Sequence, residues 1–132
     1  MISGSEYVDI TATASTGLTG NQYNVVRSTG VTAQGNLTAL LCTQSTNGVN
    51  GAKGVLQNDP DTGQAAILRV QGLTKLVASA AIAVGDLVGC STDSRGVTVA
   101  TTGPHGFGRA ESASTAAGQI ISVRLSGTLV PW

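Results

Sequence analysis

The chain has 132 residues, of which 41% are hydrophobic and 11% charged, and seven basic residues balance seven acidic ones. An average soluble protein is about 25% charged but carries a similar apolar fraction, so this composition excludes intrinsic disorder. The basic residues are spread singly, and no stretch approaches the roughly 20 apolar residues of a membrane span. We therefore expect one domain with a single core, and neither nucleic acid nor a membrane as partner.

The N-terminal region is rich in Ser, Thr, Gly and Ala, has little periodicity and ends in a turn-like segment at residues 18–21. We expect an extended N-terminal arm over residues 1–21 and a single β domain over residues 22–132. Residues 1–6 have neither the basic nor the apolar segment of a signal peptide, so synthesis in the cytoplasm is expected.

The first part of the β domain contains short runs of β-branched residues bounded by glycine and asparagine, which favours strands over helices. Strands are expected at residues 22–27, 31–33, 37–42 and 54–57, with a loop at 43–52. In residues 58–63 Asp and Pro favour a tight turn in which glycine adopts a positive φ.

The second part continues the same pattern of short strands and turns. Strands are expected at residues 65–71, 73–77, 87–90, 96–100, 106–110 and 119–125, with a break at Gly72, a loop at 78–83 and a hairpin turn at 93–96. Strands repeating at such short spacing, with turn residues between them, predict an all-β fold, a small β-barrel or β-sandwich.

Few residues are of the types that form metal, redox or catalytic sites. Cys42 and Cys90 each lie in an apolar segment, without the spacing of a metal or redox motif, so we expect buried thiols rather than a disulfide. His105 lies in a turn of glycine and proline, and sequence spacing places no nucleophile or orienting acid beside it. There is no glycine-rich phosphate loop, so we expect no cofactor and no catalytic residue.

Four aspartates in turns suggest either a calcium site or turn capping. The spacing of Asp59 and Asp61 falls short of the twelve-residue calcium loop. Aspartate side chains in turns accept hydrogen bonds from nearby backbone N–H groups, and this explains Asp86 and Asp93 equally well. We therefore expect no metal site.

Trp132 is a large apolar side chain in a chain whose other aromatic residues are two Tyr and one Phe. Such a side chain is not expected to remain in water. It either folds back on its own domain or packs on a neighbouring subunit, and the sequence leaves both open.

Two runs carry a resemblance to a known family: GVLQNDPDTGQ at residues 54–64 and AIAVGDLV at residues 81–88. Shorter matches follow in order, with VQG at 70–72, GV at 96–97, GRA at 108–110 and ISVRL at 121–125. From Gly54 to about Gly127 the chain resembles small phage head proteins regarded as capsid decoration or cement proteins. Residues 1–50 depart from that family in length and composition.

The resemblance implies a β fold without an active site. It also implies homotrimers that bind the major capsid protein at threefold or quasi-threefold positions on the outside of an assembled head and stabilise the capsid. The protein would then belong to the virion, on the capsid surface, after synthesis in the host cytoplasm. The arm would lie as an extended strand on a neighbouring subunit. The candidate capsid or subunit interface residues are Tyr7, Val8, Ile10, Leu18, Tyr23 and Trp132.

Two rival functions belong to other classes. A structural β module of a phage tail, fibre or baseplate would share the β composition and the lack of catalytic residues. A small trimeric β hydrolase working through Asp86 and His105 would instead lose turnover in an Asp86→Asn variant.

Overall fold

The computed structural model describes residues 7–28, 30–32, 35–41, 44–45, 48–49, 52–99 and 106–126. Within these residues the chain is all β, as the sequence predicts, and contains no helix. The strands are β1 (Tyr7–Ala14), β2 (Val25–Arg27), β3 (Thr38–Leu41), β4 (Gln44–Ser45), β5 (Gly48–Val49), β6 (Ala52–Leu56), β7 (Ala65–Val77), β8 (Leu87–Cys90), β9 (Gly96–Thr98), β10 (Gly108–Ala110) and β11 (Ile120–Ser126). A 9-stranded sheet contains all of them except β4 and β5, which form a separate hairpin.

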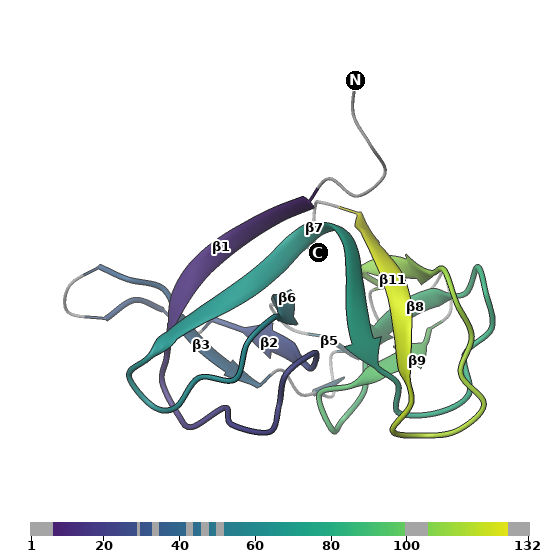
Figure 1. Ribbon diagram of the computed structural model, residues 1–132, viewed down its shortest axis with the longest axis horizontal. Coiled ribbons are helices and arrows are strands. Elements are labelled where there is room, and N and C mark those ends of the chain that lie inside the picture. Colours follow the sequence, from purple (N-terminus) through teal and green to yellow (C-terminus); the bar gives the residue numbers. More distant parts are fainter. Residues whose placement is uncertain are drawn as a thin grey trace.

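The first half of the sheet closes on itself. Its strands follow the order β1-β3-β2-β6-β7, and β1 also pairs with β7. β1 runs parallel to β3, and the other pairs of this ring are antiparallel. We call this ring the first barrel; it occupies the left side of Figure 1.

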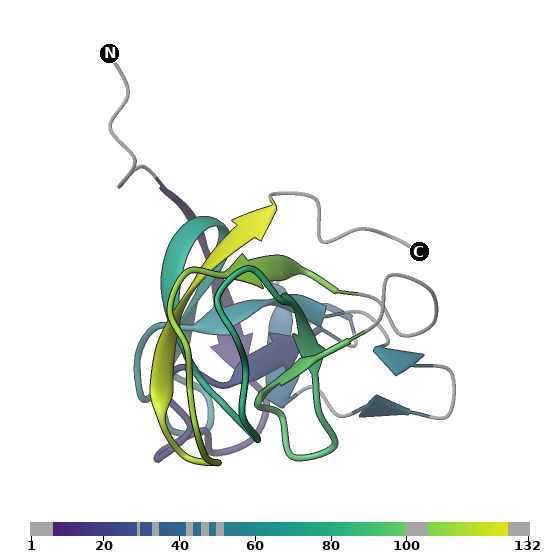
Figure 2. The ribbon, with the colours of Figure 1, turned by 90° about the vertical axis from the view of Figure 1, so that its right-hand side faces the viewer.

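The second half continues from the same long strand in the order β7-β11-β10-β8-β9, with every pair antiparallel. Just beyond β7, Ala78 forms a parallel bridge with Gly96 of β9, and the N–H of Ser79 donates to the Gly96 carbonyl at 2.7 Å. These contacts join the end of β7 to β9, so the five strands close into a ring, which we call the second barrel. Figures 1 and 2 show it as the green and yellow strands on the opposite side from β3.

β7 joins the two barrels because it runs without a break from Ala65 to Val77. It bends over the top of the molecule in Figure 1, and Gly72, with φ +96, lies within it. A side chain rarely tolerates this backbone conformation, which explains why glycine occupies the position. The strand break expected at Gly72 is therefore wrong, since this glycine bends the strand and leaves its pairing intact.

Each barrel has its own core. The first core contains Ala12, Ala14, Leu18, Val26, Ala39, Leu56, Ala66 and Leu68. The second core contains Val25, Val55, Leu76, Ala78, Ile82, Val88, Cys90, Phe107, Ala110, Ile121, Val123 and Leu125. The expectation of a single core is therefore wrong.

β2 and β6 form a wall between the cores. Val25 faces the second core and its neighbour Val26 faces the first, and Val55 and Leu56 divide in the same way. Successive side chains of a strand point to opposite faces, so two adjacent buried apolar residues mean that both faces are covered. This wall couples the two cores through shared backbone.

The structure corrects the expected N-terminal arm over residues 7–21. β1 pairs with β7 from Tyr7 to Thr13, and the side chain of Leu18 is completely buried in the first core. Ala12 and Ala14 point into the same core. Small residues suit the interior of a narrow barrel, so a composition typical of a flexible segment here belongs to a packed strand.

The strand expected at residues 31–33 is wrong, because Val31 forms an isolated bridge with Leu37 and the N–H of Gly35 donates to the Thr32 carbonyl at 2.9 Å in a turn. Most of the remaining expected strands are present with shifted boundaries. The strand expected at 22–27 begins only at Val25, because residues 21–24 form a turn in which the N–H of Asn24 donates to the Asn21 carbonyl at 3.0 Å. The loop expected at 43–52 contains the β4–β5 hairpin. Cys90 is completely buried, as expected, whereas Cys42 lies outside the described residues.

Candidate interface site

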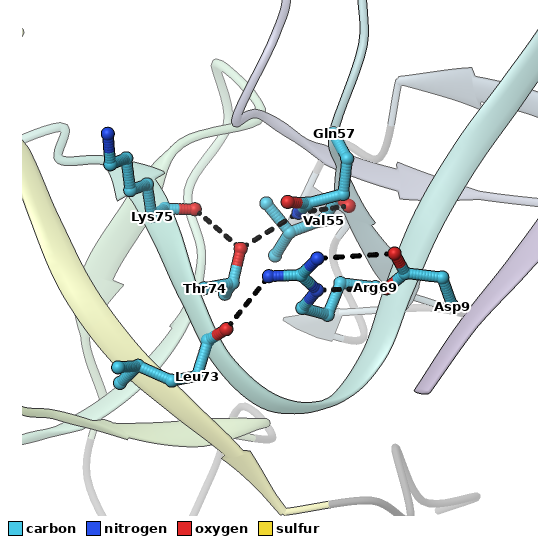
Figure 3. A network of polar contacts seen from close by, with 7 residues as sticks. All are labelled: Asp9, Val55, Gln57, Arg69, Leu73, Thr74 and Lys75. Carbon is cyan, nitrogen blue, oxygen red and sulfur yellow. Dashed lines mark hydrogen bonds and ion pairs between the residues drawn. The ribbon is translucent and has the colours of Figure 1, made fainter. Parts of the chain in front are cut away.

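The clearest polar cluster lies at the bend of β7, around Arg69. The guanidinium Nε and Nη2 donate to the two carboxylate oxygens of Asp9, directly opposite on β1, at 2.8 and 3.2 Å. Nη1 donates across the bend to the Leu73 carbonyl at 3.1 Å (Figure 3). The guanidinium carbon also lies 3.6 Å from the centroid of the Tyr7 ring, a cation–π contact. Arg69 therefore ties β1 to both arms of the bent strand.

The charge state of Arg69 follows from this geometry. The hydrogen bond to Asp9, partly opposed by burial, raises the pKa of Arg69 above its ordinary value. Only 17% of the Arg69 side chain and 25% of the Asp9 side chain are exposed. The pair is thus a neutralised, largely enclosed element that stabilises the bend.

A cavity of about 250 Å³ opens under the bend. Its lining residues are Tyr23, Gln57, Arg69, Leu73, Thr74, Lys75 and Ser122. Gln57 Nε2 donates to Thr74 Oγ1 at 2.8 Å and to the Val55 carbonyl at 3.0 Å, and Thr74 Oγ1 donates to the Lys75 carbonyl at 2.9 Å (Figure 3). Gln57 and Thr74 satisfy each other, and among the described residues no side-chain hydrogen bond joins Ser122 to Lys75, the nearest approach in this lining to a nucleophile with a base.

Tyr23 occupies one side of this cavity with an unusual backbone, since its φ is +70. Its N–H donates to the Leu56 carbonyl at 2.7 Å, and its carbonyl accepts from Val77 N–H at 3.0 Å. The ring packs against the second core, and Lys75 Nζ lies 5.8 Å from its centroid.

The structure separates the residues predicted to form a capsid or subunit interface. Tyr7 and Val8 are 53% and 46% exposed at the start of β1, and Ile10 packs partly buried against the first core. Leu18 has no exposed surface to offer a partner, so its place in the predicted interface is wrong. Trp132 lies outside the described residues.

Arg69 was missed by sequence reasoning, although it connects Tyr7 with the cavity that Tyr23 lines. The sequence did contain a signal for it, because Arg69 is the only charged residue in the apolar strand expected at 65–71. Its partner Asp9 is far away in the sequence, and the pairing of β1 with β7 brings the two together.

Asp61 and Asp86 cap nearby backbone N–H groups as expected, whereas the donor to Asp59 is 39 residues away and Asp93 accepts from the hydroxyls of Ser79 and Ser91. Asp59 accepts a hydrogen bond from Gly20 N–H at 2.7 Å, and Asp61 accepts one from Thr62 N–H at 2.8 Å. Asp86 accepts from Ala83 N–H at 3.0 Å and from the Thr98 hydroxyl at 2.9 Å. These bonds, the backbone one first, hold the pKa of Asp86 below its ordinary value. Asp86 is therefore an ionised turn cap.

The described part of the chain contains no group of three or more His, Cys, Asp or Glu side chains that could hold a metal ion. His105, the partner of Asp86 in the enzyme hypothesis, lies outside it. Across the same residues there is no helix long and apolar enough to cross a membrane.

Comparison with protein-family models and with curated proteins finds no match. Among solved structures the chain is similar to the head fibre gp8.5 N base of bacteriophage phi29, with 18% sequence identity and a TM-score of 0.65. The likeness covers 96% of this chain and 100% of that chain. At this level of identity it is a likeness of fold, and its coverage extends across both barrels.

Proposed function

We propose that this protein is a phage structural protein that binds the outer surface of an assembled head and stabilises the capsid. One observation carries the proposal: the fold matches a phage head fibre base across 96% of the chain. The decoration-protein motifs at residues 54–64 and 81–88 point independently to the same kind of particle. In the structure these runs form the β6–β7 turn and the approach to β8, which position strands and offer no reaction chemistry.

The mechanism follows from mass action. A protein that binds only where several capsid subunits meet stabilises the assembled shell, because each of its contacts is lost when the shell opens. The partner in this proposal is the major capsid protein, and the protein acts as a homotrimer at threefold or quasi-threefold positions. It has no enzymatic role, and the virion surface is its place of action.

A second candidate is a structural β module of a phage fibre, tail or baseplate. The name of the structural neighbour favours the fibre version of this alternative, since that protein is the base of a head fibre. A fibre base of this kind would need a further fibre segment as well as the head. The two candidates differ in their partners: a decoration protein needs only the shell.

Co-sedimentation with expanded head shells that lack the protein tests the proposal, paired with light scattering to measure the oligomer in solution. We expect saturable binding with the stoichiometry of threefold sites, and shells already carrying the protein should bind none. Absence of binding by a folded, defined oligomer would contradict the head-surface function. Saturable binding to purified tails or fibres, in place of shells, would establish the alternative.

A further inference from the structure

The second barrel presents a continuous outer face on β7, β11, β10 and β8. Leu73, Arg124, Arg109 and Leu87 lie directly opposite one another across these four strands. Opposed residues of antiparallel strands project from the same side of a sheet. Leu76, Val123, Ala110 and Val88 on the same strands point into the second core, so this row points away from it.

The centre of this row places two positive charges together. Arg109 and Arg124 are directly opposed, and like charges in this position destabilise a pair of strands. Glu111 lies 3.5 Å from Arg124, whereas Arg109 donates to the Gly85 carbonyl at 3.3 Å and has no ion pair among the described residues. The carboxylate of Glu111 therefore pairs with one of the two opposed guanidinium groups and leaves the other, that of Arg109, without an ion pair among the described residues.

Lys75 adds a third cation on the same face. It lies opposite Ser122 in the adjacent row, is exposed, and has no ion pair among the described residues. Among the described residues, the outer side of these strands thus carries Arg109 and Arg124 at the groove, Lys75 nearer Tyr23, and one carboxylate, that of Glu111, in a chain whose formal net charge is +0. This contrasts with the bend of β7, where Arg69 is neutralised by Asp9.

The charged row borders an apolar groove with a volume of about 460 Å³. Phe107 and Leu125 of the second core are among its lining residues but are almost completely buried, so the more accessible apolar side chain of the lining is that of Leu87. Leu87 and the two arginines form its sides, and Ile120, 55% exposed, lies on the same outer face opposite Val77. The face therefore combines apolar area with an excess of positive charge.

We propose that this face binds an acidic, partly apolar segment of the head shell protein. A carboxylate placed between Arg109 and Arg124 would supply the missing negative charge, form charge-assisted hydrogen bonds and remove the repulsion between the opposed guanidiniums. An apolar side chain of the same segment would pack on Leu87, beside the two arginines. The inference rests on the proposed function for the identity of the partner, but the chemistry of the segment follows from the face itself.

The face suits a protein segment better than a nucleic acid. Single-stranded nucleic acid is held by tracks of positive charge and by exposed aromatic rings on which bases stack. Here two arginines line the groove, whereas Lys75 lies beside the Tyr23 ring, and the aromatic residue of the groove lining, Phe107, is only 2% exposed. A carboxylate beside an apolar side chain matches both parts of the surface.

The first test compares Arg109→Gln and Arg124→Gln with Arg95→Gln in binding to expanded head shells. Arg95 is a matched control, because it lies in the β8–β9 turn beside Asp93 at 3.8 Å and away from the groove. We expect about tenfold weaker binding for each groove variant and less than a twofold change for the control. Arg109→Gln should be as stable as the wild type or more stable, since it relieves repulsion. Wild-type affinity in both groove variants would overturn the inference and leave the proposed function intact.

The second test needs no shell. A capped peptide of alternating Glu and Leu is titrated into isotope-labelled protein, with the Gln–Leu peptide as control. We expect saturable NMR shifts at Leu87, Gly108 and Leu125, absent with the Gln peptide and at least tenfold weaker in Arg124→Gln. Equal shifts with both peptides, no shift at the groove, or stronger binding of a thymidine oligonucleotide there would each overturn the inference. These outcomes do not depend on whether the protein binds heads.

Discussion

The two barrels share one strand but differ in what fills them and in what they present to solvent. Alanine supplies half of the described residues of the first core, whereas the second includes Phe107 and a larger set of branched side chains. On the outside, the first barrel carries the neutralised Asp9–Arg69 pair and the second carries the opposed Arg109 and Arg124. In the proposal made above, the first barrel is a compact support and the second makes the contacts with the shell.

The largest expected effects come from truncating β7 on each side of its bend. Leu68 is fully buried in the first core and Leu76 in the second, so Leu68→Ala and Leu76→Ala should each lower the free energy of unfolding by about 3 kcal/mol. Because β2 and β6 face both cores, each variant should still unfold in a single transition. Urea unfolding followed by circular dichroism measures both quantities.

Ile67→Ala is the matched control for these variants, since Ile67 lies on β7 but points outward with 37% exposure. Ile67→Ala should lower the free energy of unfolding by less than about 1 kcal/mol. Two separate transitions in either core variant would mean that the barrels fold independently, and the coupling inferred from the wall of β2 and β6 would then be wrong.

A smaller effect should follow from Arg69→Gln, which removes the partner of Asp9 at the bend. The enclosed pair also bridges to the Leu73 carbonyl, so we expect a loss of about 1 kcal/mol of stability. Amide hydrogen exchange should accelerate most along β1 and the facing half of β7. Arg95→Gln, which removes a more exposed arginine from the second barrel, should change stability little. Uniform acceleration across both barrels would contradict a local role for Arg69 in closing the first one.

The smallest effect concerns the turn that leads into β8. Folding lowers the pKa of Asp86, first through Ala83 N–H and then through the Thr98 hydroxyl, from an ordinary value of 3.8. The unfolded chain therefore takes up this proton at a higher pH than the folded protein. The stabilisation is present above pH 3.8 and is lost as pH falls through the lower folded pKa.

Asp86→Asn should accordingly lower the melting temperature near neutral pH, and the difference from the wild type should shrink in acid. Thermal scans at about pH 7 and about pH 2 measure this difference. A gap that stayed constant, or widened in acid, would show that the ionised carboxylate is not what stabilises the turn.

Local signals predicted the strands and turns of the second barrel well. The hairpin turn at 93–96 and the turn at 58–63 follow from Asp, Pro and Gly, whose preferences act over a few residues. The same local reasoning misplaced β1, because small residues describe both a flexible arm and the interior of a narrow barrel. It also interpreted Gly72 as a strand break, although pairing with β1 and β11 on either side holds β7 together.

By itself, the sequence determined that the chain is all β, that Asp61 and Asp86 cap turns, and that its motifs resemble phage head proteins. Only the tertiary structure decided that β7 serves two barrels, that Val25 and Val26 face different cores, and that Asp9 meets Arg69 while Arg109 opposes Arg124. The reason is physical: turn and strand preferences depend on neighbouring residues, whereas cores and cross-strand charge pairs depend on register between segments far apart in the chain.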